Sequence, residues 1–505
     1  MHKHKLKIFF VIIIFYGFFG WAKNSHAADF YITQNTSGFD TGADCVNAHA
    51  ISWFNTSGNW SNPKAESKIG PGDTVHLCGT ISSTLVVEAS GSDGNVITIF
   101  FDPGAKLSQA AWGTAELSSI YADGKNYIVI DGGENGTIEN TDNGTGLGNS
   151  VNSTFLNVSG NPSHWEVKNM TFSNMYVREE GTEENAYGTA AEFSGVLNDI
   201  SFHDNVVHDG NKVVYFSWYG GVSANVSVYN NAISDSAVAI TVGSGYVDSS
   251  IENVQIYNND LSRGLKWSGA PTIHTDLTHV FAAHTNTQVT GLKIYNNYYH
   301  GACGTNTTTA LFGEGPIIGP KYYNNLFVMD VNPGICSNGM IYLKQDDGAL
   351  IVNNTFISAD GVTAIELGGV TDAVVENNLF NNGGLAIGPF SSASSVTESD
   401  YNLFSSGETF LNGSWSQLDL PTWKVAHETF ELNSRTGSPL LDGNFKPQGG
   451  SPAIDHGVSL AGYFIVDKAG VSRPQGANWD IGAYEYVSNE SDATPPASPS
   501  GLFVD

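Results

Sequence analysis

The chain has 505 residues, with 50 acidic side chains against 21 basic ones and a formal net charge of −29. So acidic a chain excludes nucleic acid as a partner. It would also repel free polyanions unless bridging cations or a locally basic groove intervened, whereas neutral glycans meet no such barrier.

The first residues form a predicted export signal. Lys3, Lys5 and Lys7 precede an apolar run from Ile8 to Ala22, and Ser25-His26-Ala27 has the small-x-small pattern of a cleavage site. The run is short for a membrane span and no later stretch approaches 18 apolar residues, so no integral membrane segment is expected in the mature protein. Cleavage removes four lysines and no acid, which takes the net charge from −29 to −33. We expect a bacterial protein that is secreted or displayed at the cell surface, as a monomer.

A two-residue signature recurs along the rest of the chain. The pairs are Asn230-Asn231, Asn258-Asn259, Asn296-Asn297, Asn324-Asn325, Asn353-Asn354 and Asn377-Asn378. Successive pairs are 28, 38, 28, 29 and 24 residues apart, and each unit carries short β-branched and aromatic runs without helical periodicity. Such a unit cannot bury its apolar face alone, so the units must stack into a solenoid. We interpret the asparagines as turn residues that tolerate αL geometry and hydrogen-bond the equivalent asparagine one coil away.

On these residues the chain, from Ala28 to Tyr486, resembles the right-handed parallel β-helix proteins of the pectate-lyase type. In those proteins an asparagine ladder occupies the turn between the second and third strands of each coil. The resemblance implies an all-β fold, a right-handed parallel β-helix with an N-terminal cap and a short C-terminal linker.

The predicted organisation follows the repeats. We expect a signal peptide over 1–27, a cap and entry coils over 28–125, regular coils over 126–405, closing coils over 406–487 and a linker-like tail over 488–505. The motifs Ser451-Pro452-Ala453-Ile454-Asp455 and Asp480-Ile481-Gly482-Ala483-Tyr484-Glu485 look like the terminal coil of secreted bacterial β-helix proteins. The tail, with Thr494-Pro495-Pro496, has the composition of a linker.

Four cysteines allow three disulfide pairings, and export favours disulfides. We predict Cys45–Cys78 and Cys303–Cys336, because the second pair falls in equivalent loops of adjacent coils. Neither pair has zinc-ligand spacing.

In each coil the predicted second strand leads into the asparagine turn. The apolar run that precedes this second strand is the predicted first strand. These runs are Val238 to Val242, Leu277 to Ala283, Ala310 to Glu314, Met340 to Lys344 and Ala364 to Gly368. Alternation sends Val280, Leu311 and Ile341 inward and their neighbours outward. The predicted central outward column is Thr241, Phe281, Phe312, Tyr342, Glu366; a second column is Ala283, Glu314, Lys344; a third holds His279.

The aromatic column predicts a sugar-stacking platform of Phe281, Phe312 and Tyr342, and packing beneath a loop is the alternative. Glu314 and Lys344 on adjacent coils are candidates for catalysis or for a structural ion pair. Tyr219 lies near the same face and could stack on a sugar. The tyrosine column before the asparagine turns, with His203 at its head, is expected to be structural.

Two long connections enter the first-strand face and could wall a cleft. The connection from Arg178 to Gly188 contains Glu180, Glu183 and Glu184, which predict either a weak Ca²⁺ site or a solvated loop.

The connection from Arg263 to Asp276 adds Lys266, Trp267 and His274. Its His274-Thr275-Asp276, followed by His279, looks like the His-x-Asp-Gly-Ile-His pattern of some secreted β-helix proteins, but Leu277 and Thr278 replace Gly and Ile. Metal ligation and a hydrogen-bonded loop are both open interpretations.

The predicted reaction is β-elimination on a polysaccharide. A lyase needs a base near a sugar C5 proton and a cation for the adjacent carboxylate, which Arg263, Lys266, His279 and Lys344 could provide. Hydrolysis needs carboxylates about 5–9.5 Å apart, whereas strand geometry puts Glu314 and Glu366 about 12 Å apart. A glycoside hydrolase remains one alternative, since Asp276 could complete a pair, and a non-catalytic glycan-binding β-helix remains another.

Overall fold

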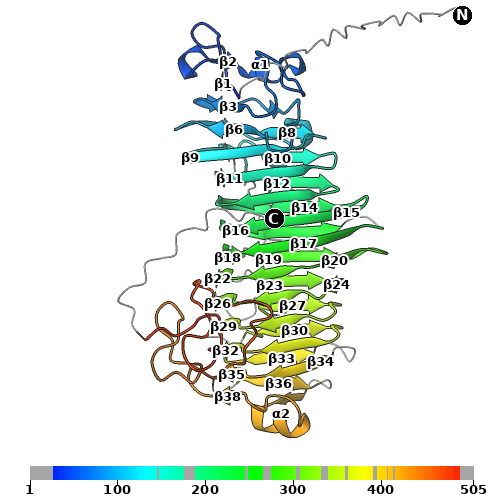
Figure 1. Ribbon diagram of the computed structural model, residues 1–505, viewed down its shortest axis with the longest axis vertical. Coiled ribbons are helices and arrows are strands. Elements are labelled where there is room, and N and C mark those ends of the chain that lie inside the picture. Colours follow the sequence, from blue (N-terminus) through cyan, green and yellow to red (C-terminus); the bar gives the residue numbers. More distant parts are fainter. Residues whose placement is uncertain are drawn as a thin grey trace, which may run out of the picture.

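A computed structural model describes residues 27–144, 147–175, 188–244, 248–264, 275–302, 307–330, 339–358, 362–389, 395–405, 408–412 and 416–488. The strands stack into a long solenoid whose axis is vertical in Figure 1. Every strand pair in these residues is parallel except β36–β37, and strands two or three apart in sequence pair with one another from coil to coil. The fold is a right-handed parallel β-helix, as predicted.

Three parallel sheets run the length of the solenoid, one for each strand position in a coil. The first contains β5 (Leu85–Val86), β8 (Ile120–Asp123), β10 (Ser153–Ser159), β12 (Gly188–Gly195), β14 (Val206–Trp218), β16 (Ala232–Ser244), β19 (Thr275–Ala282), β23 (Thr307–Glu314), β27 (Ile341–Lys344), β30 (Ile365–Gly368), β33 (Leu385–Pro389) and β36 (Thr409–Asn412). The predicted first strands from Val238 to Gly368 all lie in this sheet.

The second sheet contains β1 (Asp29–Thr33), β3 (Thr74–Leu77), β6 (Ile97–Phe101), β9 (Ile128–Asn140), β11 (Ser163–Ser173), β13 (Asn198–His203), β15 (Val222–Tyr229), β17 (Ser250–Tyr257), β20 (Gln288–Thr290), β21 (Lys293–Tyr295), β24 (Ile317–Ile318), β25 (Lys321–Tyr323), β28 (Leu350–Val352), β31 (Ala373–Glu376) and β34 (Val396–Asp400). The third contains β4 (Thr80–Ile81), β7 (Lys106–Gln109), β18 (Asp260–Gly264), β22 (Tyr298–Ala302), β26 (Leu326–Asp330), β29 (Thr355–Ser358), β32 (Leu379–Asn381), β35 (Leu403–Phe404) and β38 (Arg435–Thr436). The second halves of β9 and β11 and the first halves of β14 and β16 also belong to it.

The asparagine turn lies between the second and third sheets, and the two asparagines of a pair do different work. The first adopts a positive φ, as at Asn258 (55°) and Asn296 (58°). The second is buried: the Nδ2 of Asn297 donates to Ile256 O at 2.9 Å and to Asn325 Oδ1 at 3.1 Å, while its Oδ1 accepts the N–H of Asn259 at 3.0 Å. The predicted ladder is confirmed, and it extends to Asn205 and Asn402, which no asparagine precedes.

Stacked aromatic rings fill the interior and line the outside of the second sheet. Inside, the rings of Tyr299, Phe327, Phe356, Phe380 and Phe404 stack in series at 4.6–5.2 Å between centroids. Outside, His203, Tyr229, Tyr257, Tyr295 and Tyr323 stack at 4.4–4.9 Å, as the column in the sequence suggested. This regular stacking follows from one residue of each type recurring per coil.

Small elements close both ends of the solenoid. Near the N-terminus lie β2 (His49–Ala50), α1 (Ile51–Phe54) and the 3₁₀ turns η1 (Cys45–Asn47) and η2 (Ser57–Asn59), and η3 (Ala115–Leu117) follows two coils later. The predicted Cys45–Cys78 disulfide is confirmed; Cys303 and Cys336 lie outside the described residues. At the other end β37 (Ser416–Leu418) pairs back on β36, and α2 (Leu420–Ala426) places Trp423 5.0 Å from Phe410.

The closing segment then runs back beside the lower coils (Figure 1). There it contacts the first asparagines of the turn pairs: Asn324 Nδ2 donates to Val466 O, Asn353 Nδ2 to Asp480 O and Asn377 Nδ2 to Val458 O, each at 2.8–2.9 Å. The buried Arg473–Glu485 ion pair (2.7 Å) fixes the segment's own fold. No helix in the described residues is long and apolar enough to span a membrane.

Candidate functional site

No single residue type repeats in every coil on the outward side of the first sheet. In register from β12 to β30, its central column is Glu192, Tyr215, Thr241, His279, Phe312, Tyr342 and Glu366. Two residues further along each strand, the second column is Ser194, Ser217, Gly243, Phe281, Glu314, Lys344 and Gly368.

This register corrects the predicted columns in one coil. His279, not Phe281, lies in the central column, and Phe281, not Ala283, lies beside Glu314. The alternation of β19 was read correctly, but the strand is displaced by two residues, because Thr278 occupies an inward position where an apolar residue was expected. The hydroxyl of Thr278 is satisfied there by the hydroxyl of Tyr299 at 3.1 Å.

In this register three predicted catalytic residues lie together. Lys344 Nζ donates to Glu314 Oε1 at 2.6 Å, and His279 Nε2 lies 3.7 Å from Glu314 Oε2. The second distance is a contact that is too long for a hydrogen bond. His279, together with the bond from Lys344, holds the pKa of Glu314 at about 2, and Glu314 in turn raises the pKa of Lys344. At neutral pH Glu314 is therefore a carboxylate and Lys344 an ammonium.

The aromatic residues of this face stack on one another. The ring of Phe312 lies parallel to His279 at 4.7 Å and to Tyr342 at 5.0 Å, so both of its faces are covered and only 5% of it is exposed. The predicted platform of exposed ring faces is therefore wrong for Phe312, since rings stacked along the solenoid axis turn their edges outward. Tyr342 and Phe281 are partly exposed.

Two glycines leave room for the rings of Phe281 and Tyr342. A Cβ on Gly243 would lie 2.0 Å from the ring of Phe281, and one on Gly368 would lie 3.2 Å from the ring and hydroxyl of Tyr342. The rings of Phe281 and Tyr342 thus lean over the neighbouring coils. Any larger residue at Gly243 would displace Phe281 from His279, which it contacts at 4.7 Å.

Glu366 follows Tyr342 in the central column and has the most unusual carboxyl group of this face. It is 8% exposed, and among the described residues its buried Oε2 has no hydrogen-bond partner. Burial alone raises its pKa to about 7. Sequence reasoning placed Glu366 in the column but could not detect this burial, which makes it a candidate acid or base near neutral pH.

A second cluster on the same sheet was missed from the sequence. Lys212 Nζ lies 5.0 Å from the ring centroid of Tyr215, and Glu192 is in register with Tyr215. Burial lowers the pKa of Lys212 and raises that of Glu192. Extending the alternation of the first strands back to Gly188–Trp218 would have found Glu192 and Tyr215, but not the partial burial of Lys212.

The other predicted residues lie elsewhere or outside the described residues. Arg263, at the end of β18, forms an exposed ion pair with Asp235, and Asp276 is fully buried in register with Val238 and Thr309. Tyr219 follows β14, and its N–H donates to Gly195 O at 3.0 Å. The residues outside are Lys266, Trp267, His274 and the predicted metal ligands Glu180, Glu183 and Glu184.

One grouping of possible metal ligands occurs in the part of the chain that the structure describes: Cys45, Cys78 and Asp102. The two cysteines form the disulfide, so their sulfur atoms are not thiolate ligands. Nothing in the cluster of His279, Glu314 and Lys344 has the ligand set of a metal centre.

No family model and no curated protein matches the sequence. Solved structures do resemble it. Pectate lyase Pel9A is 14% identical over 91% of this chain and 97% of its own, with a TM-score of 0.37; XylC in complex with xylose is 10% identical over 90% and 98%, with a TM-score of 0.45. DFA-IIIase from Arthrobacter chlorophenolicus A6 is 11% identical over 70% and 86%, with a TM-score of 0.42. No residue role is carried over from them.

Proposed function

We propose that this protein is an exported carbohydrate-active enzyme that cleaves a polysaccharide by β-elimination on the outward face of its first sheet. The observation that carries the proposal is the cluster in which one carboxylate, Glu314, contacts both Lys344 and His279. Export is supported by the signal-like first residues and by the Cys45–Cys78 disulfide, which persists in oxidising compartments.

In this mechanism His279 is the base and Lys344 the acid. His279 takes the C5 proton of a uronic acid unit, the electron pair forms a C4–C5 double bond, the bond from C4 to the leaving oxygen breaks, and that oxygen takes a proton from Lys344. Glu314 orients both groups and keeps Lys344 protonated, which is the positioning role that a third group plays beside a catalytic base. The ammonium also offsets the charge of the sugar carboxylate.

The electrostatics of the face are compatible with a uronic acid chain in spite of the acidic surface. Glu314 is already paired, and Glu366, with its pKa of about 7, is largely neutral in mildly acidic solution. The face therefore carries less negative charge than its residues suggest, so the substrate's carboxylates meet less repulsion there than over the rest of the molecule.

Hydrolysis is a second candidate, favoured by one observation. Glu366 and Glu314 have pKa values of about 7 and about 2, the kind of separation that assigns one carboxyl as acid and the other as an ionised partner. Against it, the two residues are two coils and two positions apart, about 12 Å by strand geometry, beyond the roughly 5–9.5 Å that glycosidases use.

A panel of acidic and neutral polysaccharides incubated with the purified protein separates the possibilities. Elimination produces an unsaturated sugar that absorbs near 235 nm. New reducing ends without that absorbance would replace the proposal with hydrolysis. Binding without either product would make the protein a non-catalytic glycan binder.

A further inference from the structure

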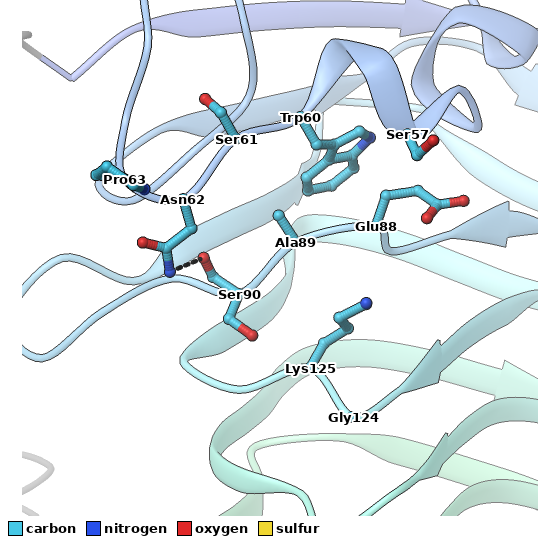
Figure 2. Close-up of a pocket in the computed structure, with 10 residues that line it drawn as sticks. All are labelled: Ser57, Trp60, Ser61, Asn62, Pro63, Glu88, Ala89, Ser90, Gly124 and Lys125. Carbon is cyan, nitrogen blue, oxygen red and sulfur yellow. Dashed lines mark hydrogen bonds between the residues drawn. The ribbon is translucent and has the colours of Figure 1, made fainter.

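A polar hollow lies far from the cluster at Lys344, near the N-terminal end of the solenoid. It has a volume of about 600 Å³, which is the size of a small-molecule site. Figure 2 shows its lining, which comes from the segment after α1, from the residues that follow β5 and from those that follow β8. Seven strand spacings separate β8 from β27, roughly 34 Å along the axis.

The hollow contains two opposite charges that do not pair. Glu88 and Lys125 are both half-buried, and in Figure 2 their ends extend into the same space. No ion pair or hydrogen bond joins the Glu88 carboxylate or the Lys125 ammonium to any residue that the structure describes. An acceptor and a donor thus face the hollow with their hydrogen-bonding capacity unused, and their charges sum to zero.

The remaining lining is fixed in place. The indole N–H of Trp60 donates to Phe54 O at 2.6 Å, and the residue is 5% exposed, so it forms a rigid wall rather than a stacking surface. Ser90 Oγ accepts the N–H of Asn126 at 3.1 Å, which leaves its own proton available to donate. Asn62 Nδ2 donates to Ser90 O at 3.0 Å and holds the two lining segments together (Figure 2).

We propose that this hollow is a separate binding site for one or two units of a neutral saccharide. Sugar hydroxyls both donate and accept, so one unit can donate to Glu88 and accept from Lys125 and Ser90 at the same time. A charged ligand would leave one of the two opposite charges unmatched, whereas a neutral polyol satisfies both. The site would hold a glycan on the protein without taking part in its cleavage.

The test is binding of glucose, galactose, xylose and cellobiose to the full mature chain, measured by saturation-transfer NMR and calorimetry. At least one sugar should bind, and Glu88→Gln and Lys125→Met should each weaken it at least about fivefold, as loss of a hydrogen bond to a charged group does. Glu134→Gln, an exposed acid outside the hollow, is the matched control and should change nothing. Glu88→Gln is isosteric and keeps the shape of the side chain. An unchanged circular dichroism spectrum would verify that the variant folds.

Turnover is measured separately, so this site and the proposed enzyme can fail independently. Glu88→Gln should cleave glycan like the wild type, and Tyr342→Ala should keep the binding of the small sugar. Absence of binding by every sugar would overturn the proposal, as would binding that survives Glu88→Gln and Lys125→Met but is lost in Tyr342→Ala. Binding of glycine in place of the sugars would show a site for zwitterions and would overturn it too.

Discussion

Two columns of this solenoid, the buried asparagine ladder and the central outward column of the first sheet, use polar residues in opposite ways. In the ladder each coil repeats the same residue, and the Asn297 amide satisfies two acceptors and two donors. In the outward column neighbouring coils carry different residues, and the buried Oε2 of Glu366 has no hydrogen-bond partner among the described residues. Repetition stabilises the stack, whereas the departures from it place titratable side chains such as His279 and Glu366 on the outward face.

The comparison predicts that the largest effect on activity comes from Lys344. Lys344→Ala should reduce turnover by about 10²–10⁴-fold, the usual loss when a positioned acid is removed, and leave glycan binding largely intact. Its bond to Glu314 is partly exposed, so the free energy of unfolding should fall by only about 0.2–1 kcal/mol. Initial rates at 235 nm and urea denaturation measure the two quantities.

Lys293→Ala, on the second sheet, is the matched control and should leave turnover unchanged. If His279→Ala and Lys344→Ala both keep wild-type rates on a glycan that the protein cleaves, the catalytic residues are elsewhere on the molecule.

The ladder should show the reverse pattern. Asn297→Leu leaves the N–H and Nδ2 of Asn259 and the carbonyl of Ile256 without their partners, which should cost about 1–3 kcal/mol of unfolding free energy. Turnover per folded molecule should not change. Asn225→Gly is the control. This asparagine also has a positive φ (60°), but the hydrogen bond that its Nδ2 donates to Asp199 is exposed. Equal stability of the two variants would contradict the ladder's role.

The same contrast explains what the sequence could predict. A residue that repeats in every coil marks its own register, so the asparagine pairs were enough for the fold, the ladder and the position of the first sheet. The outward column has no repeat to fix it. There Thr278 and Gly313 occupy inward positions without a large apolar side chain, so the alternation did not show how β19 pairs with β23. The predicted columns were therefore displaced by two residues in one coil.

Other features of the site depend on three-dimensional surroundings that no local pattern encodes. Glu366 is buried although the alternation of its strand places it on the outward side, and the covered faces of Phe312 come from the stacking of His279 and Tyr342. The hollow at Glu88 and Lys125 joins three segments that are distant in sequence. In each case the residue was visible in the sequence and its environment was not.

Glu366 gives a pH-dependent effect on stability. Its folded pKa of about 7 exceeds its ordinary value of 4.5, so between these pH values the folded chain keeps a proton that the unfolded chain releases. The contribution of Glu366 to the free energy of unfolding is therefore largest below pH 4.5 and is lost as the pH rises through 7. Glu366→Gln should remove the loss, and above pH 7 it should be more stable than the wild type by about 1–3 kcal/mol.

The measurement is the difference in urea midpoint between Glu366→Gln and the wild type from pH 4.5 to 8.5. Glu314→Gln is the natural contrast, because a folded pKa of about 2 stabilises the protein above pH 4.5 and that contribution is lost toward pH 2. A stability difference for Glu366→Gln that does not change with pH would show that folding does not raise the pKa of this carboxyl.

The smallest effect on binding is expected from substitution of Tyr342. This substitution tests whether the outward column binds sugar. One face of Tyr342 is covered by Phe312 at 5.0 Å, so a glycan can use only its remaining face and edge. Tyr342→Ala should therefore weaken oligosaccharide binding by about 1 kcal/mol, roughly fivefold, at the low end of what a stacked aromatic contributes. Tyr342→Phe should bind like the wild type if the ring makes the contact, and Tyr463→Ala, an exposed tyrosine on the closing segment, should have no effect. Unimpaired binding in Tyr342→Ala, measured by calorimetry with a glycan that the protein cleaves, would show that the substrate does not bind at the outward column.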